Sequence, residues 1–335
     1  MDNQKNEKEI KTDRVMELFL RALKGEALSV QQLAFDYKVS TRSISRDITS
    51  LQKFLDTHID ILGYSTLEYS SIDHCYTLKT DNFLSNRELL AITKILIGSR
   101  ALNSRDLLEI IKKLKMNTAG SDRAKLDKLI RKEIYHYNEI GSDCPSVIDN
   151  VWKLADCIEN RSVISISYYR MDRTLVKRKI KPVSILFCEY YFYLIAYMCE
   201  TDTPDMPIYY RVDRITGITV HRDTYRLTEQ QNVDEGLLRK KSQFMWPGPS
   251  RRICFEFTGP SVQAVLDRIP TAKVVEQKNG KSIIEAEVFG SGIKMFLLSQ
   301  GAWVKVLAPD EFVREMKSEI KKLTSLYETD DLEQQ

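Results

Sequence analysis

The chain has 335 residues, with 50 Lys and Arg against 47 Asp and Glu, a formal net charge of +3. At roughly 100–200 residues per domain this length predicts two or three domains, and a composition that is 43% hydrophobic and 29% charged excludes disordered and fibrous architectures. A net charge this small also excludes a general polycation, so any nucleic-acid function must depend on where the positive charges lie.

The sequence gives no support for a metal centre, a familiar catalytic motif or a membrane span. Six cysteines and four histidines complete no metal-ligand spacing, and His74-Cys75 is the nearest approach to a ligand pair. We therefore expect free buried thiols, no metal and no cofactor. The motifs G-x-G-x-x-G, G-x-S-x-G and H-E-x-x-H are absent, which favours a protein that is not an enzyme. The charged N-terminus and the lack of a long apolar run predict a cytoplasmic protein without a membrane partner.

Three short helices are predicted near the N-terminus. Residues 14–23 have helical apolar spacing, and Ser29 stands as an N-cap before a second helix. After a connector at 38–40, a third helix starts at Thr41 and carries an apolar stripe. Two short helices joined by a tight turn predict a helix-turn-helix. The stripe consists of Ile44, Ile48, Leu51 and Leu55.

The outer side of this third helix has residue types that bind DNA. Its N-terminus is a natural phosphate site, arginine can pair with guanine in the major groove, and Ser and Thr can bond bases or phosphates. Asp47 would repel phosphate, so we expect it to pair with an arginine or to be structural. A plain helical hairpin with a solvated Arg and Ser face is the alternative. The candidate DNA-binding residues are Ser40, Thr41, Arg42, Ser43, Ser45 and Arg46.

The run LAFDYKVSTRSISRDITSLQ, residues 33–52, resembles the core of DeoR-type winged helices, with Ser43 where that family usually has Thr. The next run, IDILGYSTLEYSSIDHCYTL, resembles the two strands of a wing and ends in Tyr76-x-Leu78, although the usual wing glycines are missing. The resemblance implies a winged helix-turn-helix DNA-binding domain over residues 1–80.

Residues 81–140 are predicted to form a basic helical linker. Ser85 and Glu88 have the spacing of a capping box, a second helix is expected to start at Asn103 or Ser104, and a third is expected at 122–137. Residues 87–132 hold 12 Lys and Arg but only 5 Asp and Glu. This linker is either a solvated spacer or a surface that contacts DNA flanks or a dimer partner.

After a helix at 148–160, the apolar period changes from helical spacing to two. The segments ISISYY, KRKIKPVSILF, YYFYLIAYM and PIYYRVDRITGITV are rich in β-branched and aromatic residues. Several short strands in about 80 residues suggest a small barrel. In the strand at 191–197, alternation assigns Phe192, Leu194 and Ala196 to the core, and the opposite face, with three tyrosines, is interpreted as an aromatic surface.

Basic residues surround these tyrosines. Residues 170–181 carry six Lys and Arg against one Asp. Aromatic rings interleaved with positive charges suit an anion that carries aromatic rings, such as a nucleotide or a short oligonucleotide. A strand edge protected by lysine, with half-buried tyrosines, is the alternative interpretation.

Four pieces of this region resemble the WYL domain, an SH3/Sm-like β-barrel: Ile166-x-Tyr168-Tyr169, Arg178-x-Ile180-x-Pro182, Phe192-Tyr193-Leu194 and Arg211-Val-Asp213-Arg214-Ile215. Phe192 replaces the tryptophan of the family motif, a change that retains an aromatic core role. The resemblance implies a ligand-sensing domain over 141–228, with nucleic-acid or nucleotide ligands. Arg214 has a second interpretation as a partner of Asp213 or a nearby acid. The implied ligand-binding residues are Tyr168, Arg178, Tyr193, Arg211 and Arg214.

Residues 250–328 are predicted to form a further α/β domain. Their pattern gives the order β-α-β-β-α-β-α, a ferredoxin-like plan with one added helix, and Asn279-Gly280 predicts a type I′ hairpin turn. The run GIKMFLLSQGAWVKVLAP resembles the C-terminal extension that commonly follows WYL domains.

The expected fold class is therefore α+β multidomain: a winged helix-turn-helix, a helical linker, a WYL barrel and a ferredoxin-like domain. The order of domains resembles bacterial WYL-domain transcriptional regulators. It implies a homodimer that binds double-stranded operator DNA and senses a single-stranded nucleic acid or a nucleotide through its WYL domain. The alternative is an enzyme that processes nucleic acid or nucleotides at the barrel. The barrel's acids stand at spacings unsuited to a metal cluster: Asp172, Glu189, Asp213 and Asp223.

Overall fold

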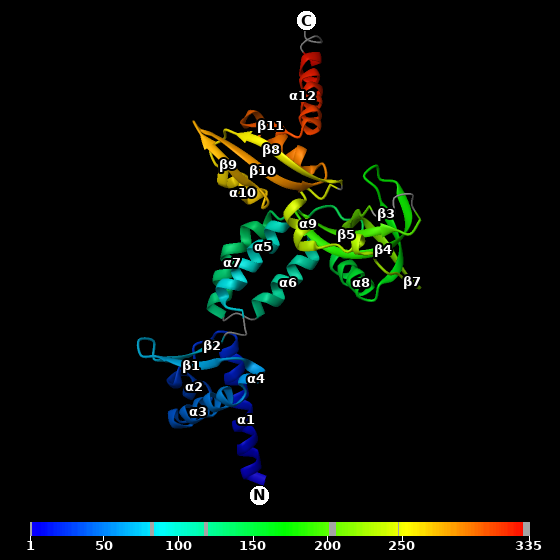
Figure 1. The fold of residues 1–335 in the computed structure, drawn as a ribbon. Helices are drawn as coiled ribbons and strands as arrows, with labels where there is room; N and C mark the ends of the chain where they lie inside the picture. Colours follow the sequence, from blue (N-terminus) through cyan, green and yellow to red (C-terminus); the bar gives the residue numbers. More distant parts are fainter. Residues whose placement is uncertain (1, 81–83, 117–119, 201–205, 247, 331–335) are drawn as a thin grey trace. The chain divides into compact units, whose positions relative to one another are not determined.

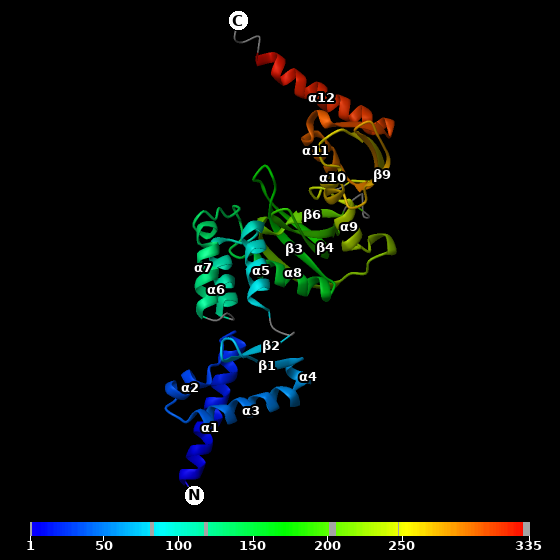
Figure 2. The ribbon, with the colours of Figure 1, turned by 90° about the vertical axis from the view of Figure 1, so that its left-hand side faces the viewer.

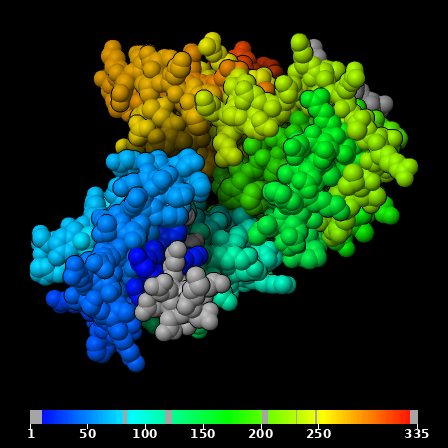
Figure 3. All heavy atoms as spheres, turned by 90° about the horizontal axis from the view of Figure 1, so that it is seen from below, coloured from blue at the N-terminus to red at the C-terminus, as the bar shows by residue number. Residues whose placement is uncertain are grey.

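The structure is a computed structural model that describes residues 2–80, 84–116, 120–200, 206–246 and 248–330. The chain divides into two compact units, Met1–Ile140 and Gly141–Gln335. Colour follows this division in the space-filling view, from blue to teal for the first unit and from green to red for the second (Figure 3). Each unit combines helices with antiparallel strands, so the chain is a mixed α/β multidomain protein, as expected.

The first part of unit 1 consists of helices followed by a hairpin (Figure 1). Antiparallel pairing joins the two strands, from Ser65 opposite Thr80 to Ser70 opposite Cys75. The element order α-α-α-β-β is the order expected for a winged helix, with a single extra turn, α4, before the hairpin. The elements are α1 (Asp2–Leu23), α2 (Val30–Asp36), α3 (Thr41–Thr57), α4 (Ile59–Leu62), β1 (Ser65–Ser70) and β2 (Cys75–Thr80).

One apolar core holds these elements together. The stripe predicted on α3 is buried against Leu18 of α1 and Leu33 of α2, and Leu67 of β1 completes the cluster. Leu28, between α1 and α2, exchanges two backbone hydrogen bonds with Tyr76 of β2, at 2.8 and 2.9 Å. The hairpin is therefore attached to the helices through both side chains and backbone.

The second part of unit 1 is a three-helix bundle with its own core, which includes Ile97, Leu107 and Ile130. The predicted capping box is confirmed: the Ser85 side chain accepts from the backbone N–H of Glu88, whose carboxylate accepts from the Ser85 N–H over 2.7 Å. Figure 2 shows the three helices side by side. They are α5 (Asn86–Ser99), α6 (Ser104–Met116) and α7 (Gly120–Tyr135).

Unit 2 begins with α8 (Val147–Glu159), which packs on a five-stranded antiparallel sheet of order β6-β5-β4-β3-β7. Within the described residues the pairing leaves β6 and β7 as free edges, so this sheet is open, whereas the sequence suggested a closed barrel. The strands are β3 (Ser162–Tyr169), β4 (Leu175–Cys188), β5 (Tyr191–Met198), β6 (Ile208–Arg211) and β7 (Ile215–Thr224), and the 3-10 turn η1 (Val212–Arg214) lies between the last two.

Both faces of the middle of this sheet are covered. Leu194 and Ala196 pack toward α8, as predicted, and Phe192 lies against the same cluster. The interpretation of the opposite face as an exposed aromatic surface is wrong, because Ile195 is 0% and Tyr197 only 2% exposed. The reason is a segment from the following linker. It contains α9 (Glu235–Lys241), and its Leu238 and Met245 pack on Ile195 and Leu186.

The C-terminal domain has the element order predicted for it. Its four strands pair antiparallel in the order β11-β8-β10-β9, so the two strands that flank each crossover helix are separated by a third strand. Asn279 and Gly280 have φ angles of 52° and 74°, as a type I′ turn requires. The elements are β8 (Ser250–Phe257), α10 (Val262–Arg268), β9 (Lys273–Lys278), β10 (Lys281–Phe289), α11 (Gly292–Ser299), β11 (Val304–Ala308) and α12 (Asp310–Asp330).

Candidate functional site

The turn between α2 and α3 sets the direction of the predicted recognition helix. Lys38 has a left-handed φ of 54°, and the backbone N–H groups of Lys38 and Val39 donate to the carbonyls of Phe35 and Ala34. Ser40 then caps α3, because its hydroxyl accepts from the N–H of Ser43 over 3.2 Å. The helix start is thus fixed by hydrogen bonds local to the turn.

The candidate DNA-binding residues all lie in the first two turns of α3 or at its cap. Thr41, Arg42, Ser45 and Arg46 are exposed. In the described part of the chain, neither arginine forms an ion pair with a carboxylate. Arg42 and Arg46 stand one turn apart, on the same side of the helix. They can therefore approach one anionic surface together.

The serines are less free than the sequence suggested. The Ser45 hydroxyl donates to the carbonyl of Thr41 over 3.0 Å, and the hydroxyls of Ser40 and Ser43 lie 3.0 Å apart. The Ser45 proton is thereby engaged within the helix, and one of the Ser40 and Ser43 hydroxyls donates to the other. Thr41, Arg42 and Arg46 are the residues best placed to donate outward.

The expected role of Asp47 is confirmed. Its carboxylate is 1% exposed and accepts a 2.6 Å hydrogen bond from Nε of Arg14 on α1. The negative charge that would repel phosphate is thereby turned into the core and neutralised. Arg14, which the sequence analysis did not single out, has this positioning role, and only the packing of α1 on α3 reveals it.

The five residues proposed to bind a ligand fall on two faces of the five-stranded sheet. Tyr193 and Arg211 are direct partners across β5 and β6, and Tyr193 packs with the cluster under α9. Tyr168 packs against the cluster under α8 instead. Arg214 lies in the 3-10 turn after β6 and is partly exposed. The structure therefore does not bring all five into one site.

On the α9 face, Arg211 is held by its neighbours. It forms two hydrogen bonds with the Asp213 carboxylate, at 3.1 and 2.6 Å, and its guanidinium carbon lies 3.4 Å from the ring centroid of Tyr191. Asp213 is 6% exposed and pairs with Arg211, so the alternative that Arg214 is its partner is wrong. Burial raises the pKa of Tyr193 to about 12, although the nearby Arg211 opposes the rise.

On the α8 face of the sheet, two tyrosines lie close to exposed arginines. The rings of Tyr168 and Tyr210 meet edge to face with centroids 5.1 Å apart. Arg178 is exposed and close enough to oppose the burial that raises the pKa of Tyr210 to about 12. A hollow of about 330 Å³ adjoins Tyr168 and Arg170 at the β3–β4 turn. Arg170 was part of the basic run in the sequence but was not selected as a site residue.

A second cavity, of about 290 Å³, lies against the other face of the sheet, beside α9. Tyr197 and Tyr209 of the sheet face Leu238 of α9 and Phe289 of β10 across it. Burial raises the pKa of the Tyr209 phenol. The lining of this cavity is chiefly apolar and aromatic.

The described residues contain no group of three or more His, Cys, Asp or Glu side chains that could hold a metal ion. All six cysteines are free thiols, of which Cys75, Cys144 and Cys157 are buried and the other three only partly buried. Burial raises the pKa of the Cys144 and Cys157 thiols. Among the helices that the structure describes, none is both long and apolar enough to cross a membrane.

Two family matches agree with this architecture. Residues 149–220 match the WYL domain and residues 250–324 match the WCX domain. The chain therefore contains a WYL domain that is followed by a WCX domain. The resemblance drawn from the sequence is confirmed for both domains. No curated protein matches the chain.

Two solved structures are similar to the chain. One is the Proteasome accessory factor B/C (PafBC) of Arthrobacter aurescens, at 15% identity and a TM-score of 0.27, covering 92% of this chain and 48% of that chain. The other is described as a CRISPR Cas-related protein, at 15% identity and a TM-score of 0.37, covering 75% of each chain. The chain thus spans about half the length of the PafBC chain that it matches.

Proposed function

We propose that the protein is a sequence-specific DNA-binding transcription regulator in which residues 1–80 act as a winged helix-turn-helix. The observation that carries this proposal is the first half of α3, where Arg42 and Arg46 are exposed while Asp47 is buried against Arg14. A helix that directs its cations outward and its only nearby acid inward suits the major groove of DNA.

The small net charge of residues 1–80 supports a modest DNA affinity for each subunit. Residues 1–80 hold 11 Lys and Arg against 12 Asp and Glu, so the domain is close to neutral and its DNA affinity is proposed to depend on Arg42 and Arg46. One short helix reads few base pairs, which favours a homodimer on a two-fold operator. Cytoplasmic DNA is the partner that this proposal requires.

The WYL domain is proposed to sense a phosphate-bearing ligand with aromatic rings. The group at Tyr168, Arg170 and Arg178 supports this role best, because both arginines are exposed and Arg170 lies with Tyr168 and Asp172 beside a hollow. Tyr193 and Arg211 are proposed to act from the other face, by holding Asp213 and the β5–β6 edge in place. Ligand binding would then shift the protein between DNA-competent and DNA-incompetent states.

The test begins with enrichment of duplexes from a randomised DNA pool, followed by footprinting on the selected sequence. Arg42→Ala or Arg46→Ala is expected to weaken binding by about 1–3 kcal/mol if the residue contacts a base. Lys317→Ala on the exposed side of α12 is the matched control. Unchanged footprints for both α3 variants would reject α3 as the recognition helix.

A second experiment addresses the ligand and the enzymatic alternative. Native mass spectrometry of protein purified from cells is expected to reveal a co-purified nucleotide or oligonucleotide. We propose binding without turnover, so incubation of labelled oligonucleotide with the protein and Mg²⁺ or Mn²⁺ should leave it intact. Metal-dependent cleavage would favour an enzyme that uses the WYL domain as its site.

A further inference from the structure

The solvent side of α7 carries the largest group of cations without acidic partners in the bundle. Lys125, Lys128, Arg131 and Lys132 are all exposed, and none forms an ion pair with any residue that the structure describes. At 3.6 residues per turn these four positions fall within about 120° of the helix circumference. They form a stripe, here called the α7 basic stripe.

Two acids of α7 whose side chains the structure describes form ion pairs with the neighbouring helices. Glu133 pairs with Lys94 of α5 and Asp127 pairs with Lys115 of α6, each at 2.5 Å. These pairs neutralise the acids within the bundle, so they cannot compensate the stripe. An ordinary solvated helix mixes both signs along its exposed face. Here the four cations of the stripe form no ion pair among the described residues, whereas Asp127 and Glu133 are each paired with a lysine of a neighbouring helix.

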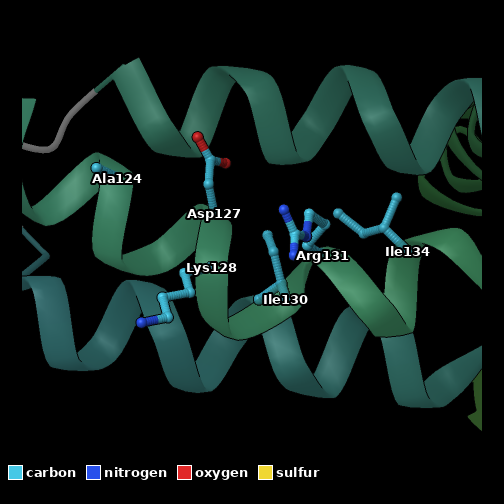
Figure 4. Close-up of a pocket in the computed structure, with 6 residues that line it drawn as sticks. All are labelled: Ala124, Asp127, Lys128, Ile130, Arg131 and Ile134. Carbon is cyan, nitrogen blue, oxygen red and sulfur yellow. The ribbon is translucent and has the colours of Figure 1, made fainter.

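The shape of this side suits a linear polyanion. Lys125 and Lys132 are about 10.5 Å apart along the helix axis, a span that covers roughly three phosphates of one DNA strand at 3.4 Å each. A hollow of about 670 Å³ lies beside Lys128 and Arg131, and Asp127, which pairs with Lys115, also lines it. All the labelled side chains in Figure 4 come from α7, and those of Asp127 and Lys128 extend in different directions from it. Tyr135, 83% exposed, lies one turn beyond Lys132.

We propose that the α7 basic stripe binds the phosphate backbone of double-stranded DNA, as a sequence-independent contact additional to α3. This inference rests on the proposed function, since it assumes that the protein binds DNA. Only five residues separate β2 from α5, and six chain steps reach at most about 20 Å. A DNA-bound winged helix would therefore hold the bundle at high effective concentration near the same duplex.

The test uses a fluorescein-labelled duplex of random sequence, about 30 base pairs long, and the full chain, with anisotropy titrations between about 50 and 200 mM salt. The variant is Lys125→Ala/Lys128→Ala/Lys132→Ala, in which alanine preserves helix propensity. Each lost phosphate contact makes the plot of log affinity against log salt shallower by about 0.9, so a total change of about 2 to 3 is expected. The control is Lys317→Ala/Lys321→Ala/Lys322→Ala on α12, which removes the same charge and should leave the slope unchanged.

The outcomes separate this inference from the proposed function. If the α7 variant retains the wild-type slope, or differs no more than the α12 control, the stripe does not bind DNA. If sedimentation shows that the variant has lost an oligomeric state while its slope per subunit is unchanged, the stripe is a protein interface and the inference is wrong. If Arg42→Ala/Arg46→Ala binds the selected duplex normally but the α7 variant does not, the inference stands and α3 is not the recognition helix. If the wild type binds neither the random duplex nor any selected duplex at about 50 mM salt, both proposals fail.

Discussion

Arg14 of α1 donates a 2.6 Å hydrogen bond to the buried carboxylate of Asp47, which lies directly beside Arg46 on α3. The Asp47 side chain is 1% exposed and that of Arg14 12%, so the pair is almost completely desolvated. The second carboxylate oxygen, Oδ1, has no hydrogen-bond partner among the described residues. The carboxylate therefore depends on Arg14 for compensation of its charge.

We predict that Arg14→Met destabilises the N-terminal domain by about 3 kcal/mol, because it leaves an uncompensated buried charge. The double variant Arg14→Met/Asp47→Leu should recover most of this loss, since it removes both charges. Hydrogen exchange of the α3 amides in the full chain measures the effect locally. Equal losses in the single and double variants would show that packing, rather than charge, is what Arg14 contributes.

The two faces of the WYL sheet should respond differently to loss of an arginine. Arg178→Ala is expected to weaken binding of a labelled oligothymidine tetramer without lowering the melting temperature, because Arg178 is exposed and has no carboxylate partner in the described chain. Arg211→Ala is expected to lower the melting temperature, because it leaves the buried carboxylate of Asp213 unpaired. Arg211→Lys is the control that keeps the charge. A stable Arg211→Ala variant that alone loses tetramer binding would reverse the two assignments.

Alkaline pH should destabilise unit 2 in a defined window. Burial raises the pKa of Tyr193, Tyr210 and Tyr225 to about 12, from 10.0. The unfolded chain loses these protons near pH 10, so the stability that comes from keeping the phenols neutral is complete below pH 10 and lost as pH rises toward 12. Tyrosinate absorbance should show late-titrating phenols that include these three among the 16 tyrosines. Tyr210→Phe should remove one of them, and a single titration step for all tyrosines would contradict the prediction.

Two glycines should behave in opposite ways when changed to alanine. A Cβ at Gly292, the first residue of α11, would lie 1.8 Å from the Gln243 carbonyl oxygen, so Gly292→Ala must move backbone and is expected to cost about 1–3 kcal/mol. A Cβ at Gly98 in α5 would meet nothing within 4 Å, so Gly98→Ala is expected to stabilise by up to about 1 kcal/mol. Thermal unfolding of the full chain measures both. A neutral Gly292→Ala would mean that the close approach of Gln243 relaxes without cost.

Local signals in the sequence predicted most helices and strands and several caps, but not α4, α9 or the first half of α1. The Ser85–Glu88 capping box, the Asn279-Gly280 turn and the apolar stripe of α3 depend on neighbouring residues, so their patterns are readable along the chain. The WYL and WCX matches confirm the resemblance drawn from such patterns.

Tertiary structure decided what covers each face and which charges meet. Alternation in 191–197 separated the two faces of β5, but only the return of the linker beside α9 determined that Ile195 and Tyr197 are buried. The same holds for ion pairs between elements distant in sequence. Asp47 was expected to find an arginine, and only the packing of α1 on α3 selects Arg14. Periodicity and capping depend on residues a few positions apart, so the sequence alone determined them. Burial and ion pairing depend on chain segments that meet in space, so only the fold decided them.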